Sequence, residues 1–231
     1  MTDRSVPDLA WSYHGESGPE HWSSLSQSFK RCNEGLQQSP VDIVAIERVT
    51  GERIVFLYDS NVIAVNNTGR TISVWYELGS SMAIGGRVYD LVTAHHHAPS
   101  EHLIDGKQYA AEMHLVHESA QGDLAVVARL FEFGDSNPLI DSFLEGAVSG
   151  RILSEAHWPL HSRLLQPRGE EYYHYVGSTT TPPCIEPVEW LVIAETGTIS
   201  DSQFKALLSA TGGPNNRPVQ ALNGRTITHV V

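Results

Sequence analysis

Basic side chains and long apolar runs are both scarce in this sequence. Its 231 residues contain 15 Lys and Arg against 27 Asp and Glu, a formal charge of −12 at pH 7. A chain this negative repels a phosphate backbone, which argues against a nucleic-acid partner. No apolar run approaches the roughly 20 residues that cross a bilayer. We therefore expect no nucleic-acid partner and no membrane span.

Cysteine is also rare, and the first residues lack the apolar stretch of a signal peptide. The chain begins MTDRSVPDLAW and has only two cysteines, Cys32 and Cys184, with no Cys-x-x-Cys spacing. The residues alone leave open two free thiols, a long-range disulfide or an unrelated pair. A disulfide would indicate an oxidising compartment.

Short apolar or alternating segments dominate the rest of the chain and predict a sheet. They are 54–57, 61–65, 71–78, 87–92, 111–117, 124–131 and 188–194. Two stretches predict helices. One follows Asn137-Pro138, where Asn caps and Pro opens the first turn; the other begins at Ser200, which forms a capping box with Gln203. We expect both helices to lie against the sheet.

We expect residues 1–231 to form a single domain. The first 50 residues or so show little periodicity but contain Trp11 and Trp22. Such aromatics usually pin irregular chain onto a core, so this segment is expected to pack on the sheet.

Histidine is concentrated in two of the predicted strands. In VTAHHHAPSEH, residues 92–102, strand alternation places His95 and His97 on one face and His96 on the other. In AEMHLVH, residues 111–117, His114 and His117 face opposite ways, so only one of them can join the first pair.

Glu112 favours His114 over His117 as the third histidine. It shares a face with His114 and can accept that ring's second N–H, as carboxylates beside metal ligands do. A lone histidine in a strand is usually a satisfied core or surface residue. Three neutral imidazoles that converge without cysteine instead indicate zinc with an open fourth position, and therefore chemistry.

The run HHHAPSEHLIDGKQYAAEMHLVH resembles the central segment of the α-class carbonic anhydrases. The resemblance covers almost the whole chain. It continues through WSYHGESGPEHW, QSPVDI, YVGSTTTPPC, EWLV and NNRPVQALNGR, in that order. The HAPSEH loop and the compact length are similar to those of the bacterial members.

The resemblance implies a mainly β (α+β) fold, with a central twisted, mostly antiparallel sheet of about ten strands and short peripheral helices. It implies reversible hydration of carbon dioxide to bicarbonate and a proton through zinc-bound hydroxide. Carried over residue by residue, the site has these members: zinc ligands His95, His97 and His114; the supporting carboxylate Glu112; the hydrogen-bond relay Thr180 and Glu101; the carbon dioxide pocket Val116, Val126, Trp190 and Thr179; and the bicarbonate contact Thr181.

Two positions depart from the family pattern. Arg70 stands where the family usually has a proton-shuttle histidine, and arginine cannot release a proton near neutral pH. We expect proton export to limit turnover unless another group, such as Tyr13 or His14, replaces it. Thr93 stands where the family generally has a glutamine that supports the first ligand; a shorter side chain predicts weaker zinc retention.

The resemblance also pairs Cys32 with Cys184, which implies a periplasmic or extracellular protein whose signal peptide has been replaced by Met1. Two other functions compete with this interpretation. One is a carbonic anhydrase-like binding domain without catalysis, which usually lacks one or more zinc ligands. The other is a zinc esterase, for which no acyl pocket is recognisable. The sequence also leaves a homodimer open.

Overall fold

The computed structural model describes residues 11–44, 47–149 and 161–231. Residues 1–10 of the expected N-terminal segment therefore lie outside the described part. The helical elements are η1 (Gly15–Ser17), α1 (Trp22–Leu25), η2 (Gln27–Phe29), α2 (Arg31–Glu34), α3 (Pro138–Ser149), η3 (Ser162–Leu165) and α4 (Asp201–Ala210).

Strands make up most of the regular structure. They are β1 (Asp42–Ile43), β2 (Glu47–Val49), β3 (Val55–Leu57), β4 (Val62–Asn67), β5 (Ile72–Tyr76), β6 (Ser81–Ile84), β7 (Arg87–His97), β8 (Leu103–Ile104), β9 (Lys107–Gln108), β10 (Ala111–Ser119), β11 (Leu124–Phe133), β12 (Tyr172–Gly177), β13 (Val188–Ile193), β14 (Gly197–Ile199) and β15 (Thr228–Val230).

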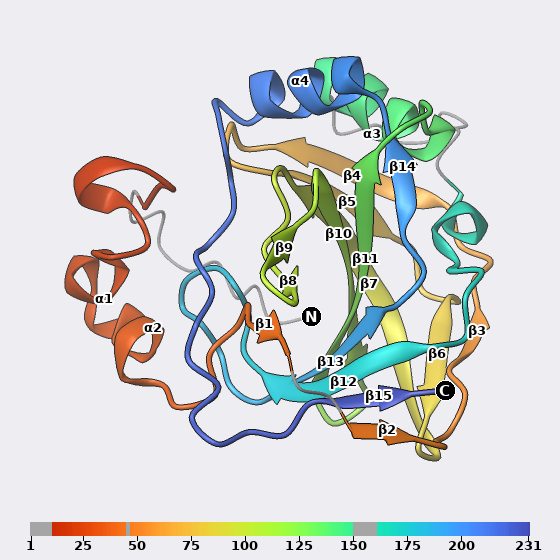
Figure 1. Ribbon diagram of the computed structural model, residues 1–231. Coiled ribbons are helices and arrows are strands. Elements are labelled where there is room, and N and C mark those ends of the chain that lie inside the picture. The colour runs from red at the N-terminus through yellow and green to blue at the C-terminus, as the bar shows by residue number, and fades with distance from the viewer. Residues whose placement is uncertain (1–10, 45–46, 150–160) are drawn as a thin grey trace.

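One large twisted sheet organises the fold (Figure 1). Within the described residues it has 12 strands, whose main path runs β2-β15-β12-β13-β11-β10-β7-β5-β4. Most neighbours are antiparallel, but β13 and β14 pair with β11 in parallel, as β15 does with β2. The expected fold class is confirmed, and the sheet is a little larger and more mixed than the expected ten strands.

The two faces of this sheet carry separate hydrophobic clusters. On one face, β10 contributes Met113 and Leu115 to a cluster that also holds Phe143 of α3 and Leu207 of α4. Figure 1 shows these two helices together at one end of the sheet. The other face carries a second cluster, centred on Trp190. The histidines of β7 and β10 are distributed over both faces of the sheet.

Both predicted helices are confirmed, with the expected caps. The side chain of Asn137 accepts a hydrogen bond from the backbone N–H of Leu139, 3.1 Å away, at the start of α3. At α4, Ser200 and Gln203 form the capping box. Because each cap uses only neighbouring residues, it can be predicted from the local sequence.

The described part of the N-terminal segment is held by aromatic packing. Trp11, Tyr13 and Trp22 meet edge to face, with ring centroids between 5.3 and 5.9 Å apart. Together with Phe29 and the two cysteines they form a third small cluster. No described helix is long and apolar enough to cross a membrane.

Candidate metal centre

Adjacent antiparallel strands bring three histidines to one point. His95 and His97 lie on β7, and the register places His114 of β10 opposite His95 and Glu112 opposite His97. The ring of His114 lies 5.2 Å from that of His95 and 4.6 Å from that of His97, centroid to centroid. One nitrogen from each ring can be chosen so that all three lie within 4.8 Å of one another.

Hydrogen bonds orient two of these rings. His97 donates from Nδ1 to the carbonyl oxygen of Asn215 at 2.7 Å, and His114 donates from Nε2 to Oε1 of Glu112 at 2.7 Å. The remaining nitrogens, Nε2 of His97 and Nδ1 of His114, carry the free lone pairs. Nε2 of His97 is buried and has no hydrogen-bond partner among the described residues. A buried lone pair without a donor, beside two further imidazoles, fits a zinc ion.

Burial also keeps the three imidazoles neutral. It lowers the pKa of His95 well below the ordinary value, that of His97 to about 4, and that of His114 as well. A metal ligand must present an unprotonated nitrogen. All three histidines are therefore ready to bind a metal at neutral pH.

Glu112 supports more than one neighbour. Its Oε1 also accepts a 2.6 Å hydrogen bond from Nδ1 of His102, and its Oε2 accepts backbone N–H bonds from Glu101 and His102 at 2.8 Å each. Burial alone would raise the pKa of Glu112, but His102 and His114 hold that pKa well below its usual range. Glu112 is thus a fixed carboxylate that locks His114. His102 was not predicted as a member of this site, although it ends the Ser-Glu-His motif.

The other two candidate histidines face away from this centre. His96 is buried against Phe143 of α3, with ring centroids 5.8 Å apart. Nε2 of His117 is 2.6 Å from the Tyr58 hydroxyl and hydrogen-bonded to it. Both sit on the α3 side of the sheet, as strand alternation predicts.

Glu101 is a fully buried carboxylate beside the histidines. Its Oε2 lies 3.4 Å from Nε2 of His97, and its Oε1 accepts a 2.8 Å hydrogen bond from the backbone N–H of Arg217. Burial raises the pKa of Glu101 to about 7, while His114 and the Thr180 side chain are among the neighbours that lower it. The structure therefore brings Glu101 and Thr180 together next to the three histidines.

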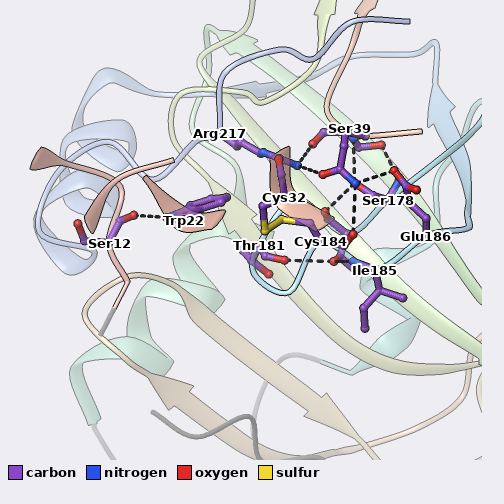
Figure 2. Close-up of a disulfide and its surroundings, with 12 residues drawn as sticks. Ser12, Trp22, Cys32, Ser39, Ser178, Thr181, Cys184, Ile185, Glu186 and Arg217 are labelled. Atoms are coloured by element: carbon purple, nitrogen blue, oxygen red, sulfur yellow. Dashed lines mark hydrogen bonds between the residues drawn. A yellow bond between two sulfur atoms is a disulfide. The ribbon is translucent and has the colours of Figure 1, made fainter. Parts of the chain in front are cut away.

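A disulfide joins the N-terminal segment to the loop that carries Thr180 (Figure 2). The predicted pairing of Cys32 with Cys184 is confirmed. The backbone N–H of Cys184 donates to the carbonyl oxygen of Thr181 at 2.9 Å, so the bridge is attached directly to this loop.

Arg217 reaches the same disulfide from the opposite side, as Figure 2 shows. Its guanidinium donates to the carbonyl oxygens of Cys32 and Ser39, at 2.6 and 2.7 Å, and to Oε1 of Gln38 at 2.9 Å. This role of Arg217, in the NNRPVQ motif, could not be predicted from the sequence because its partners are distant in the chain.

The predicted pocket residues form a wall next to the histidines. Val116 pairs with Val126, which pairs with Trp190 across β10, β11 and β13. The Trp190 ring lies 4.9 Å from the His114 ring, and its Nε1 donates to Ser178 at 2.9 Å. This wall is apolar where it faces the candidate metal centre.

The other two predicted substrate contacts, Thr179 and Thr181, lie in the loop after β12. The Thr179 hydroxyl donates to the Thr181 carbonyl at 3.1 Å and accepts from the backbone N–H of Ile185 at 2.9 Å. Because both hydrogen bonds of the Thr179 hydroxyl are made within the loop, this hydroxyl adds little polarity to the predicted substrate pocket.

Among the described residues, Thr93 makes no hydrogen bond to the first histidine ring. Its hydroxyl instead donates to the carbonyl oxygen of Val74 on β5, at 2.9 Å. Within the described residues, no hydrogen-bond partner is found for the His95 ring, unlike the rings of His97 and His114. The Thr93 side chain thus links β7 to β5 and does not support the His95 ring through a hydrogen bond.

Arg70 is held by the N-terminal segment. Its guanidinium lies 4.7 Å from the centre of the Trp11 ring, and Nη1 donates to the Trp11 carbonyl at 3.0 Å. Through these contacts Arg70 anchors the N-terminal segment at Trp11.

A family model agrees with this geometry: the model described as eukaryotic-type carbonic anhydrase matches residues 17–231. The chain belongs to the carbonic anhydrase family. It is therefore an enzyme with carbonic anhydrase activity, the hydration of carbon dioxide.

Three relatives illustrate the similarity. A carbonic anhydrase of Neisseria gonorrhoeae is 37% identical over 222 residues, which cover 94% of this chain and 86% of that protein. A hyperthermostable carbonic anhydrase from a hydrothermal vent chimney is 41% identical, with a TM-score of 0.87 over 96% of this chain and all of the other. The α-carbonic anhydrase of Thermovibrio ammonificans, solved with the inhibitor sulfanilamide, is 34% identical, with a TM-score of 0.84 over 95% of this chain and 99% of the other.

Proposed function

We propose that this carbonic anhydrase hydrates carbon dioxide reversibly at a zinc ion held by His95, His97 and His114. The observation that carries the proposal is the convergence of three neutral imidazoles, one of which has a buried nitrogen with no hydrogen-bond partner among the described residues. Zinc bound there would lower the pKa of a coordinated water and so supply hydroxide at neutral pH.

Thr180 and Glu101 orient the attacking hydroxide. The Thr180 hydroxyl is hydrogen-bonded to Glu101, whose Oε1 is fixed by the backbone of Arg217, so Thr180 would donate its proton to Glu101 and accept a hydrogen bond from the nucleophile that zinc supplies. A nucleophile held this way points a lone pair at the substrate carbon, which lowers the barrier through orientation.

The apolar wall holds carbon dioxide beside the nucleophile. Val116, Val126, Trp190 and Thr179 form the pocket for the uncharged substrate, and Thr181 contacts bicarbonate. Carbon dioxide has no charge to pair, so an apolar wall positions it without the desolvation cost of a polar site.

Proton export limits turnover. An arginine guanidinium is not a proton carrier near neutral pH, and that of Arg70 is anchored to Trp11. Burial raises the pKa of Tyr13 well above its ordinary value, so Tyr13 is not a substitute. Of the two N-terminal candidates, exposed His14 is left as a proton carrier, and buffer molecules supply the rest.

The disulfide supports an exported protein, in the periplasm or outside the cell. We also propose that residues 1–231 act as a single domain. Sedimentation would measure whether two copies of the chain form a homodimer.

Replacement of each histidine by glutamine tests the proposal. H95Q, H97Q and H114Q should each lose stoichiometric zinc and most of the carbon dioxide hydration, whereas H96Q, on the same strand but the other face, should keep both. A chain that retains zinc in all three ligand variants contradicts the proposal. Stoichiometric zinc in the wild type without any hydration favours the alternative of a binding domain.

A further inference from the structure

A pocket of about 530 Å³ opens where the start of α3 meets β11 and β14, two strands that lie side by side in Figure 1. The charged side chains that line it are Arg129, Arg168 and Glu195. Hydroxyl and amide side chains, such as those of Ser142 and Gln166, line much of the rest. With two cations and one carboxylate, the pocket has a net positive charge in a chain whose formal charge is −12.

The pocket lies on the face of the sheet opposite the three histidines. On β11, Ala128 and Leu130 belong to the second hydrophobic cluster, on the histidine side, whereas Phe131 belongs to the cluster on the α3 side. Arg129 lies between Ala128 and Leu130, so alternation points its side chain toward α3. The sheet therefore separates this pocket from the candidate metal centre.

Arg129 is held in place but makes few hydrogen bonds. Its Nη1 donates to the carbonyl oxygen of Leu165 at 3.0 Å, and its guanidinium carbon lies 5.8 Å from the centre of the Phe131 ring. A guanidinium has five N–H donors, and within the described residues this is the one side-chain hydrogen bond found for Arg129. The other donors of this half-buried cation are available to a ligand in the pocket.

The charge of Arg129 is not neutralised by an ion pair. In the part of the chain that the structure describes, neither Arg129 nor Arg168 forms an ion pair with a carboxylate. Burial lowers the pKa of Arg129; Glu195 opposes this effect, whereas the like charge of Arg168 adds to it. A second anion in the pocket would relieve the repulsion between the two guanidinium groups.

The first turn of α3 offers a ligand little by comparison. Pro138 has no N–H, and the backbone N–H groups of Leu139, Ile140 and Asp141 are hydrogen-bonded to the side chain or carbonyl oxygen of Asn137. An anion in this pocket would therefore be held by the two arginine side chains.

We propose that Arg129 and Arg168 form a binding site for the phosphate group of a small polar molecule, on the face of the sheet opposite the metal centre. Two guanidinium groups match a dianion, and each can donate two parallel hydrogen bonds to phosphate oxygens. The pocket is of the size that small-molecule ligands occupy, so it has room for the body of the molecule beside its phosphate group. The hydroxyl and amide side chains of the lining favour a polar body. This site is independent of the proposed zinc site.

Calorimetric titration of the metal-loaded protein with inorganic phosphate tests the site. R129Q and R168Q should each bind phosphate roughly 10-fold more weakly than the wild type, and E195Q, which removes the competing carboxylate, should bind it roughly 3-fold more tightly. Arg168 is exposed, so R168Q tests the site without a change in the core. Acetate, which has a single charge, should bind the wild type more weakly than phosphate does.

R163Q is the matched control. Arg163 is an exposed arginine of η3 that pairs with Asp59 at 2.8 Å and is not among the residues that line the pocket. Its replacement should leave phosphate binding unchanged.

Three results would overturn the proposal: no phosphate binding to the wild type, unchanged binding in both R129Q and R168Q, or a loss in R163Q as large as theirs. Acetate that binds as tightly as phosphate would overturn the assignment of a phosphate group. Carbon dioxide hydration, measured on the same preparations, should be equal in the wild type, R168Q and E195Q. A failure of the phosphate site is therefore distinguishable from a failure of the proposed function.

Discussion

The backbone N–H of Arg217 donates a 2.8 Å hydrogen bond to Oε1 of Glu101, and so ties the proposed relay to the disulfide. The same residue holds the Cys32 carbonyl through its guanidinium, while Cys184 is bonded to the loop of Thr180. The bridge therefore fixes both members of the relay, Glu101 from one side and Thr180 from the other.

Arg217→Lys should impair both catalysis and stability. Lysine keeps the charge but cannot reach three acceptors with one planar group, so the backbone that fixes Glu101 loosens. We expect kcat/KM for hydration to fall roughly 10-fold and the free energy of unfolding to fall by about 2 kcal/mol. Stopped-flow hydration and urea unfolding measure the two effects.

Arg225→Lys is the matched control. Arg225 also donates to several carbonyl oxygens, including those of Val176 and Gln38, but does not contact Glu101. It should lower stability and leave kcat/KM unchanged. A similar loss of kcat/KM in both variants would show that the effect of Arg217 is general destabilisation.

Removal of the disulfide should lower stability and activity together. The double variant C32S/C184S is expected to lose about 2–5 kcal/mol of unfolding free energy, because the unfolded chain regains conformational freedom. Its hydration rate should fall at temperatures where it is still folded, since the Thr180 loop is no longer held. The wild type can also be reduced completely, with its free thiols counted to verify this. Full activity of that reduced protein would contradict a link between the disulfide and the Thr180 loop.

Arg70→His should make turnover less dependent on buffer. A histidine at this position can exchange protons near neutral pH, whereas the wild type must rely on imidazole or other buffers. We expect kcat of the wild type to rise with imidazole concentration and the variant to show a higher kcat in dilute buffer. H14A should deepen the buffer dependence if His14 exports part of the protons. A wild-type rate that is flat in imidazole, with no gain in the variant, rejects a proton-transfer limit.

Thr93→Gln should slow the loss of zinc. The longer amide can reach the His95 ring, which has no hydrogen-bond partner among the described residues, and such support changes metal affinity by roughly 10- to 100-fold. Zinc release into a chelator, followed by colorimetry, gives the rate. Thr93→Val, which lacks the hydroxyl but keeps the volume, serves as the control. Identical rates of zinc release from all three proteins would show that the residue at position 93 does not affect zinc retention.

Glu189 should contribute to the acid sensitivity of the fold. A 2.8 Å hydrogen bond with Nε2 of His174 holds the pKa of the partly buried Glu189 below its ordinary value, and Arg87 adds to this. Because the folded pKa is lower than the unfolded pKa of about 4.3, the contribution is complete above the unfolded pKa and is lost as pH falls through the folded pKa.

Unfolding in urea from pH 7 to pH 3 tests this, with Glu189→Gln for comparison. The wild type should lose roughly 1 kcal/mol more than the variant over that range. Parallel curves for the two proteins would mean that Glu189 does not carry the acid sensitivity.

Local signals predicted the parts of the fold that depend on neighbouring residues. Strand alternation separated His96 from His95 and His97, and the caps at Asn137 and Ser200 marked both helices. The extra strands of the sheet escaped prediction because elements of two or three residues, such as β2 and β14, are too short to show a period.

Long-range contacts at the site could not be read from the residues. Arg217 is 116 positions from Glu101, and Asn215 is 118 positions from His97. No local pattern reports such a pairing, and the family resemblance covers the motif without assigning the contact. The hydrogen bond from Thr93 to the Val74 carbonyl could not be predicted either, because several acceptors lie within reach of a threonine hydroxyl.

Zinc content and carbon dioxide hydration, measured together on one preparation, test the central claim most directly. We predict one zinc per chain, loss of hydration in parallel with zinc when a chelator removes it, and recovery when zinc is restored. Hydration that persists unchanged after the metal has been removed would contradict the account.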